Sequence, residues 1–393
     1  MVVLFVSPYF REKGKMPTGD GMEMYLYRVS LALKKLGHTP IIVSIGSKEQ
    51  HYIENGIEIY FVYCKYIEIS NNKNINLVYN RLLRSKAINK KVMQISKKKK
   101  IDLIQFSSLQ GLSIFYYGNI PAVMRLSSYA KIYYKDYSFS KTEYWIRILC
   151  EWIGAKRCNA LFGPSKVIAN AFAKDVHRSV SIIETPFWNE CHYYDESIYN
   201  SKLRNKKYTL FIGRMQIEKG IFVIKECLRA FLKSNPDYYF VCCGKDSFVD
   251  GQSAVCLLTD ASGEYKNRFI YIEKQPHETL YPVIQHADFV ICPSIAENFS
   301  NVCLEAMYFE RVVIGTDGTS YEQLIDDGKN GMLCEPGNAD SLLQKMNNAA
   351  AMSLQEKEKM GKNANKRIER LKPEIAVEKL IRYYKYVIAH VCN

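Results

Sequence analysis

PSIAENFSNVCLEAMYFERVVIGTDGTSYEQLIDDGKNG, residues 293–331, holds two glutamates, Glu297 and Glu305, with seven residues between them. The apolar run 289–292 predicts a strand, and Ser300 or Asn301 is a good N-cap for a helix that carries Glu305. A strand, a loop and a helix N-terminus in this order form an anion site, because backbone N–H groups and the helix dipole point at the strand end. Carboxylates beside such a site repel phosphate but accept hydrogen bonds from hydroxyls. The stretch therefore predicts a site for a nucleotide sugar.

A second motif, YTLFIGRMQIEKG at residues 208–220, places Arg214 and Lys219 just past a predicted strand, where a doubly wound sheet binds its ligand. An arginine offers a planar fork to phosphate oxygens, and a lysine offers a point charge. By itself the motif could be two surface cations near a turn. The two glutamates that follow it along the chain favour a diphosphate site, in which both cations stabilise a leaving diphosphate.

These two motifs, with LEAM at 304–307 and GTSYEQLIDDGKNG at 318–331, resemble the retaining glycosyltransferases of family 4, which have the GT-B fold. The resemblance covers most of the chain and is strongest from about 205 to 345. It implies that Arg214 and Lys219 hold the donor diphosphate, that Glu305 binds the nucleotide ribose, and that Glu297 approaches the donor sugar. It also implies that the departing phosphate serves as the base.

The candidate site residues fall into three groups. The catalytic candidates are Arg214, Lys219 and Glu297, and the donor or nucleotide candidates are Gly213, Gly244, Ser300, Asn301, Val302 and Glu305. In the first half of the chain the candidates are Gly19, Gly21 and Ser127. The two glycines follow the first strand after a long loop but lack the third glycine of a dinucleotide fingerprint, because Met24 stands in its place. In the family a glycine-rich loop here borders the diphosphate and the acceptor; a plain flexible loop is the alternative.

The sequence departs from the family at residues 125–128, RLSS, where many members have R-L-H-G. Ser127 then takes the place of a histidine that faces the donor sugar. A serine can hydrogen-bond a sugar hydroxyl but cannot shuttle a proton near pH 7 as histidine does. No H-x-x-x-H cluster and no D-x-D triplet occurs, so we expect neither a metal nor any other cofactor.

Composition is that of an ordinary soluble globular protein, with 48% hydrophobic and 24% charged residues in 393. No apolar run approaches the ~20 residues of a membrane span, and the N-terminus lacks the features of a secretory leader. The twelve cysteines are scattered, which favours buried thiols in a reducing cytoplasm. The net charge of +14 lies mostly in residues 1–200, which carry +12, against +2 in residues 201–393. A solvated basic face or attraction to an anionic membrane would explain this, whereas no nucleic-acid-binding signature is present.

Strands alternate with helices in both halves, which predicts an α/β protein with two Rossmann-like β/α/β domains facing a central cleft. We expect an acceptor-binding domain at residues 1–190 and a donor-binding domain at 205–373, with a hinge at 190–207. Residues 374–393 are apolar at helical spacing and are expected to pack back on the first domain, although a simple surface helix fits the pattern nearly as well.

The sequence therefore predicts a retaining, hexosyltransferase-type enzyme that moves a sugar from a nucleotide-diphosphate sugar to a glycan or lipid-linked glycan. The expected location is the cytoplasm or the cytoplasmic membrane face, in cell-surface polysaccharide biosynthesis. A nucleotide-sugar epimerase on the same fold is one alternative, and a non-catalytic member that binds sugar nucleotides or membranes is another.

Overall fold

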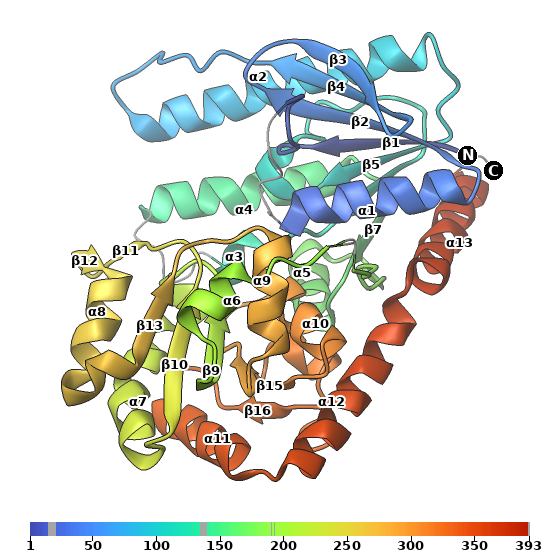
Figure 1. Ribbon diagram of the computed structural model, residues 1–393. Coiled ribbons are helices and arrows are strands. Elements are labelled where there is room, and N and C mark those ends of the chain that lie inside the picture. Colours follow the sequence, from blue (N-terminus) through green and yellow to red (C-terminus); the bar gives the residue numbers. More distant parts are fainter. Residues whose placement is uncertain (15–20, 134–139, 190, 192, 392–393) are drawn as a thin grey trace. The chain divides into compact units, whose positions relative to one another are not determined.

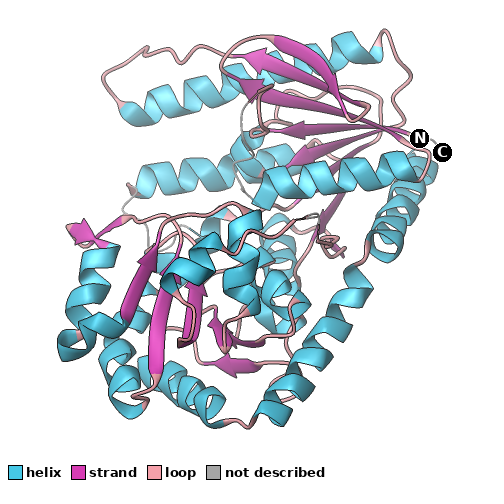
Figure 2. Ribbon diagram, viewed as in Figure 1, coloured by secondary structure: helices cyan, strands magenta, loops and turns pink. Residues whose placement is uncertain are grey.

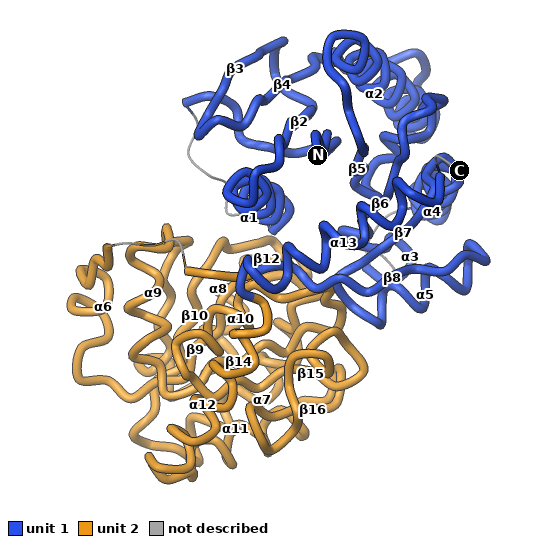
Figure 3. The backbone as a smooth tube through the Cα atoms, turned by 90° about the vertical axis from the view of Figure 1, so that its right-hand side faces the viewer, with its two compact units in different colours: residues 1–186, 372–393 blue, residues 187–371 orange. Residues whose placement is uncertain are grey.

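The computed structural model describes residues 1–14, 21–133, 140–189, 191 and 193–391. The chain divides into two compact units (Figure 3). Unit 1 consists of Met1–Pro186 together with Lys372–Asn393, and unit 2 is Phe187–Leu371. Each unit is a mostly parallel sheet with helices on both faces, and the strands and helices alternate along the chain (Figures 1 and 2).

Unit 1 has an eight-stranded sheet in the order β3-β4-β2-β1-β5-β6-β7-β8. Its strands are β1 (Val2–Ser7), β2 (Thr39–Gly46), β3 (Gln50–Glu54), β4 (Ile57–Tyr63), β5 (Leu103–Ser107), β6 (Ala122–Arg125), β7 (Ala160–Gly163) and β8 (Ser181–Ile182). Its helices are α1 (Gly21–Lys35), α2 (Lys73–Ser96), η1 (Leu109–Gly111), α3 (Ala130–Tyr133), α4 (Lys141–Lys156), α5 (Lys166–Val176) and α13 (Pro373–Val391). The residues of α2, α4 and α5 pack in one apolar cluster with one face of the sheet.

Helix α13 belongs to unit 1 although it comes last in the chain. It buries an apolar stripe that includes Val377, Leu380 and Tyr384. The Tyr384 hydroxyl donates to Gln105 of β5, and the Tyr383 ring packs edge-on against Phe162 of β7 at 5.3 Å. The C-terminal segment is thus part of the core of unit 1 rather than a helix lying free on the surface.

The antiparallel strand β3 departs from the purely parallel pattern expected for this half. Asn55 and Gly56 connect it to β4 and have positive φ values of 50° and 69°. Asn-Gly is a strong signal for a two-residue hairpin, because both residues tolerate this conformation. The sequence interpretation missed this signal, which follows an edge strand whose side chains alternate between half-buried and exposed.

Unit 2 has a six-stranded parallel sheet in the order β13-β10-β9-β14-β15-β16. Its strands are β9 (Lys207–Ile212), β10 (Tyr238–Cys243), β13 (Phe269–Ile272), β14 (Phe289–Ile291), β15 (Val312–Thr316) and β16 (Met332–Cys334), and β11 (Phe248–Val249) and β12 (Gln252–Ser253) form a separate hairpin. Its helices are α6 (Ser197–Lys202), η2 (Ile217–Lys219), α7 (Ile221–Ser234), α8 (Ala254–Ala261), η3 (Gly263–Arg268), α9 (His277–Gln285), α10 (Asn301–Tyr308), η4 (Ser320–Gln323), α11 (Ala339–Ala351), α12 (Leu354–Ile368) and η5 (Glu369–Leu371).

The two faces of this sheet carry separate apolar clusters, one with α7, α8 and α11 and the other with α9, α10 and α12. Alternate residues of the strands enter one cluster or the other, as a strand covered on both faces requires. Every cysteine among the described residues is a free thiol, and most of these thiols are buried in such clusters.

The boundary between the units lies at residues 186 and 187 rather than in the expected hinge at 190–207. Helix α6 lies within that stretch, and its residue Tyr199 stacks on His286 with ring centroids 3.9 Å apart. Ile198 packs against the same apolar cluster as α9. The polar composition of the stretch concealed these few apolar contacts, which attach it to unit 2.

Candidate functional site

The candidate donor site of unit 2 is built on β9 and β14, which are adjacent parallel strands in the middle of the sheet. Gly213 and Arg214 follow the end of β9, and the loop carrying Glu297 follows the end of β14. Both loops therefore leave the same carboxyl edge, where open α/β sheets bind ligands. Ser300 caps α10, and its hydroxyl accepts a hydrogen bond from the Cys303 N–H at 3.3 Å.

Close backbone contacts hold these loops together. Gly220 has a φ of +82°, and a Cβ atom there would lie 2.1 Å from the Pro293 carbonyl oxygen. The Ile295 N–H donates to the Glu218 carbonyl at 3.0 Å. Only glycine allows this approach, so the K-G pair of the motif places Lys219 directly beside the loop after β14.

Lys219 and Glu297 form an ion pair, with Nζ 2.6 Å from Oε2. Both side chains are largely covered, at 27% and 10% exposure. Burial alone would lower the pKa of Lys219, but the charge of Glu297 and the hydrogen bond to it outweigh burial and raise that pKa. Glu297 Oε1 accepts the Asn298 N–H at 3.1 Å. Lys219 is therefore a fixed ammonium, and its remaining N–H groups can donate to a phosphate.

Glu305 lies on α10, and its side chain is only 5% exposed. Its Oε1 atom is 3.2 Å from Nε2 of His277, the first residue of α9. The His277 ring stacks on Tyr281, one turn further along, with centroids 5.0 Å apart. The sequence interpretation missed His277. The signal that could have found it is its place at the start of a helix, five residues after the end of β13 at the same edge of the sheet.

The other predicted residues of unit 2 surround these two pairs. Gly213 and Gly244 lie at the ends of β9 and β10 with φ values of +144° and +152°. A Cβ atom on Gly244 would lie 1.9 Å from the Gly213 carbonyl oxygen. Asn301 and Val302 form the first turn of α10 and are partly covered. The Arg214 side chain is exposed and forms no ion pair with any residue the structure describes, unlike that of Lys219.

Two of the predicted residues of unit 1, Gly21 and Ser127, lie at the carboxyl edge of its own sheet. Ser127 follows β6, and its hydroxyl lies 3.2 Å from the Ser107 hydroxyl and accepts a hydrogen bond from Arg125 Nη1 at 3.2 Å. Arg125 is buried and stacks over the Tyr25 ring at 3.6 Å, and burial lowers its pKa. Gly21 is the exposed first residue of α1, whereas Gly19 lies outside the described residues.

Two further findings concern metal sites and membrane-spanning helices. Over the described ranges, no group of three or more His, Cys, Asp or Glu residues is arranged to hold a metal ion. None of the helices in the described part of the chain is long and apolar enough to cross a membrane.

Comparison with known families matches both halves of the chain. Residues 195–367 match the family described as "Glycosyl transferases group 1", and residues 19–187 match "Glycosyltransferase Family 4". The putative glycosyltransferase YtcC of Bacillus subtilis is 26% identical over 172 residues, which are 43% of this chain and 42% of that protein. The D-inositol 3-phosphate glycosyltransferase of Corynebacterium urealyticum is 29% identical over 32% of this chain and 30% of its own length. The matched segments thus span less than half of either relative.

Solved structures match over nearly the whole chain and show the fold. Sucrose-phosphate synthase from Thermosynechococcus elongatus has a TM-score of 0.77 at 16% identity and covers 99% of both chains. Anabaena HepE in complex with UDP and glucose has a TM-score of 0.73 at 15% identity, covering 98% of this chain and all of that one. The predicted fold class is confirmed. The chain belongs to the family 4 glycosyltransferases and has the GT-B fold.

Proposed function

We propose that the protein is a retaining glycosyltransferase of the hexosyltransferase type. It would transfer a sugar from a nucleotide-diphosphate sugar to a hydroxyl of a glycan or lipid-linked glycan in cell-surface polysaccharide biosynthesis. The observation that carries this proposal is the geometry of unit 2. An ammonium fixed by Glu297 and a largely buried carboxylate, Glu305, flank the N-terminus of α10 at the carboxyl edge of the sheet. This arrangement suits a phosphate bordered by hydroxyls.

Each group has a definite task in the proposed reaction. Lys219 and the exposed Arg214 bind the diphosphate and stabilise the charge that develops on it as the bond to the sugar breaks. Glu305 accepts hydrogen bonds from the ribose hydroxyls, and His277 orients its carboxylate. Glu297 binds Lys219 and the Asn298 N–H and still has lone pairs for a sugar hydroxyl. The acceptor hydroxyl bonds to the anomeric carbon, and its proton goes to an oxygen of the leaving phosphate.

Related solved structures support a nucleotide-sugar donor. HepE is described with UDP-glucose, and a trehalose-6-phosphate protein from E. coli with UDP-2-fluoro glucose. Both are less than 25% identical to this chain, so the donor of this protein has to be measured.

The first test is a thermal-shift screen of UDP-, GDP- and ADP-sugars. A ligand that binds only the native state raises the melting temperature according to its occupancy. We expect one donor to raise it for the wild type and to do so much less for Lys219→Ala and Glu305→Ala. Lys233→Ala, at an exposed position near the end of α7, is the matched control and should respond as the wild type does.

The identified donor then allows a test of the reaction itself. NMR of the donor with an acceptor panel should show a new glycoside with the anomeric configuration of the donor. Conversion of the donor to its epimer without any acceptor would favour an epimerase. Binding without turnover across the panel would favour a non-catalytic member.

Unit 1 has a surface that suits an acceptor carried on a membrane. The segment between β4 and α2 exposes Tyr66, Ile67 and Ile69, and Ile75 is exposed on the first turn of α2. Helix α2 adds the exposed basic residues Lys86 and Lys90. We infer that this segment contacts an anionic membrane, since apolar and basic side chains together favour such a surface. Co-sedimentation with anionic vesicles should be strong at low salt and weak with neutral vesicles. Equal binding to both would contradict the inference.

A further inference from the structure

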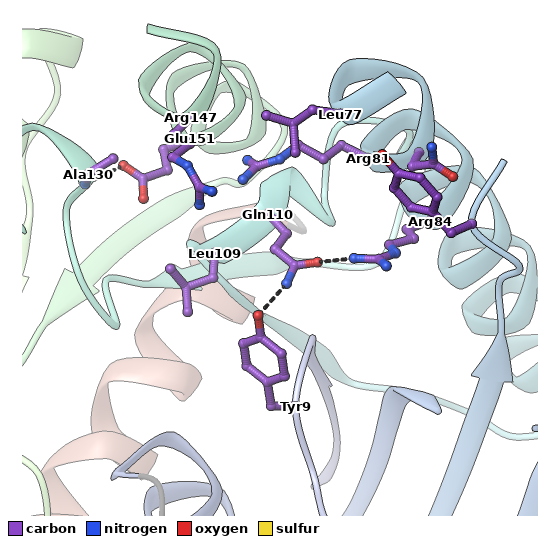
Figure 4. A pocket seen from close by; sticks show the side chains of 11 residues that line it. Tyr9, Leu77, Arg81, Arg84, Leu109, Gln110, Ala130, Arg147 and Glu151 are labelled. Carbon is purple, nitrogen blue, oxygen red and sulfur yellow. Dashed lines mark hydrogen bonds between the residues drawn. The ribbon is translucent and has the colours of Figure 1, made fainter. Parts of the chain in front are cut away.

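Unit 1 contains a pocket of about 240 Å³ at the carboxyl edge of its sheet (Figure 4). Tyr9 follows β1, Leu109 and Gln110 follow β5, and Ala130 follows β6. Strands β1 and β5 are neighbours, and the chain runs from β1 to β2 on one side and returns to β5 on the other. The pocket thus lies at the topological switch point, where open α/β sheets bind ligands.

Three arginines reach this pocket from two helices. Arg81 and Arg84 come from α2, and Arg147 comes from α4. Arg84 Nη1 donates to Gln110 Oε1 at 3.1 Å, and Gln110 Nε2 donates to the Tyr9 hydroxyl at 2.7 Å. Gln110 has a φ of +64°, an unfavourable conformation for a residue with a side chain. Strain of this kind is found preferentially at binding sites.

Arg81 has no counterion of its own. It is only 6% exposed, and no carboxylate of the described residues lies within ion-pair distance of its guanidinium. In Figure 4 this guanidinium points toward that of Arg147. The Cys150 thiol lies beside Arg81 and is a weak acceptor. An unpaired buried charge is costly to the fold, so a site that keeps one is expected to receive an anion.

Among the described residues that line the pocket, Glu151 is the one acid, and it does not neutralise the arginines. Burial raises its pKa to about 8, although the Ala130 N–H and the charges of Arg81 and Arg147 lower that pKa. Arg147 is paired outside the pocket lining, with Glu143 one turn before it on α4. At neutral pH the described lining of the pocket therefore carries a net positive charge.

We propose that this pocket binds a phosphate group of the acceptor. The identification with the acceptor rests on the proposed glycosyl transfer, whereas phosphate binding rests on the pocket alone. Its volume is below the ~300–1,000 Å³ of pockets for drug-sized ligands and suits a phosphate with part of one sugar. Tyr66 belongs both to the pocket and to the exposed apolar segment before α2. The phosphate can therefore come from a soluble sugar phosphate or from a lipid-linked diphosphate.

Calorimetric titration of the full-length Lys219→Ala protein, whose donor site is weakened, measures binding to this pocket. The probes are inorganic pyrophosphate, glucose 1-phosphate and geranyl diphosphate. We expect at least one to bind, and adding Arg81→Met should weaken that binding at least tenfold. Arg382→Met is the matched control, because its side chain is 77% exposed on α13 of the same unit. It should change the affinity less than twofold. Tighter binding of glucose 1-phosphate would indicate a soluble acceptor, and tighter binding of geranyl diphosphate a lipid-linked one.

The melting temperatures of the unliganded variants test whether Arg81 has a purely structural role. Removing an unpaired buried charge should leave the melting temperature of Arg81→Met equal or higher. A lower melting temperature with unchanged affinity would overturn the proposal, as would a folded Lys219→Ala protein that binds none of the probes. Should Arg81→Met fail to fold, Arg84→Gln takes its place. Arg84 is only partly buried, and its replacement should also weaken the binding of the probe. Nucleotide-sugar binding by the wild type is measured separately, so the two proposals can fail independently.

Discussion

The carboxyl edges of the two sheets present their polar groups in different ways. In unit 2 the cations and carboxylates come from short segments that directly follow strands, at residues 213–219 and 297–305. In unit 1 the charged groups of the pocket come from α2 and α4, which lie about 60 residues apart in the sequence. Each strand-end loop is thus a compact motif that can be read from the sequence, although the contacts between the two loops cannot. Helices that deliver side chains from a distance leave no such motif, and only the folded chain shows their convergence.

The largest expected effect concerns the backbone contact that brings the strand ends of unit 2 together. Gly244→Ala would place a Cβ atom 1.9 Å from the Gly213 carbonyl oxygen. Backbone atoms cannot yield as a flexible side chain does, so we expect a loss of at least ~4 kcal/mol of unfolding free energy or failure to fold. Chemical denaturation measures this loss. Gly318→Ala is the control, because Gly318 also has positive φ, +66°, but nothing lies within 4 Å; it should cost only about 1–2 kcal/mol. Equal losses would mean that the close approach is unimportant.

Removing the ammonium of the donor site comes next. Lys219→Ala should reduce kcat by about 10²–10³, the effect of deleting one charge-stabilising donor. It also leaves the covered Glu297 carboxylate without its partner, which should cost about 1–3 kcal/mol of stability. Steady-state rates with the identified donor and acceptor measure the first effect, and urea denaturation the second.

A double-mutant cycle separates the two roles of this pair. Glu297→Gln removes the charge that raises the pKa of Lys219. If the pair acts as a unit, the rate loss of the double variant should be much smaller than the combined losses of the single variants. Strictly additive losses would show that Glu297 contributes to the reaction without acting through Lys219.

The sequence predicted the fold well because each core strand is a short apolar run that can be recognised by itself. The strand expected at the apolar run 289–292 is β14, which ends one residue earlier, at Ile291. The errors lie where local pattern is weak, as in the polar edge strand β3 and in α6, which a few aromatic contacts hold on unit 2. Tertiary contacts decide such segments, and composition does not show them.

The sequence identified the glutamates of the candidate site but did not reveal the residues that form ion pairs with them. Glu297 and Glu305 were expected to face a donor, but the ion pairs that fix them, with Lys219 and His277, were not foreseen. Lys219 and Glu297 lie 78 positions apart, and a contact at such a distance follows from sheet order, which one sequence does not reveal. The unit 1 pocket escaped notice for the same reason.

Glu151 allows the charge of the unit 1 pocket to be measured through stability. Burial raises its pKa from 4.5 to about 8, so the folded protein keeps a proton that the unfolded chain has lost over this range. Stability contributed by this group therefore falls as pH rises from about 4.5 to about 8. Glu151→Gln does not titrate and still accepts the Ala130 N–H. Relative to the wild type, the free energy of unfolding of this variant should gain about 2–4 kcal/mol as pH rises from 5 to 8. A constant difference across this range would show that Glu151 is ionised and balances the arginines.

The smallest effect is expected at Ser127, and it tests the contrast between the two edges most directly. Its hydroxyl accepts from Arg125 and lies beside Ser107, so Ser127→Ala should cost about 1 kcal/mol of stability by removing one acceptor. If unit 2 supplies the groups that stabilise the leaving diphosphate, kcat should fall less than tenfold. Ser128→Ala, the next position, is the control. A hundredfold loss for Ser127→Ala alone, with an unchanged melting curve, would mean that Ser127 contacts the reacting sugar. The carboxyl edge of unit 1 would then contribute to the chemistry itself as well as to binding.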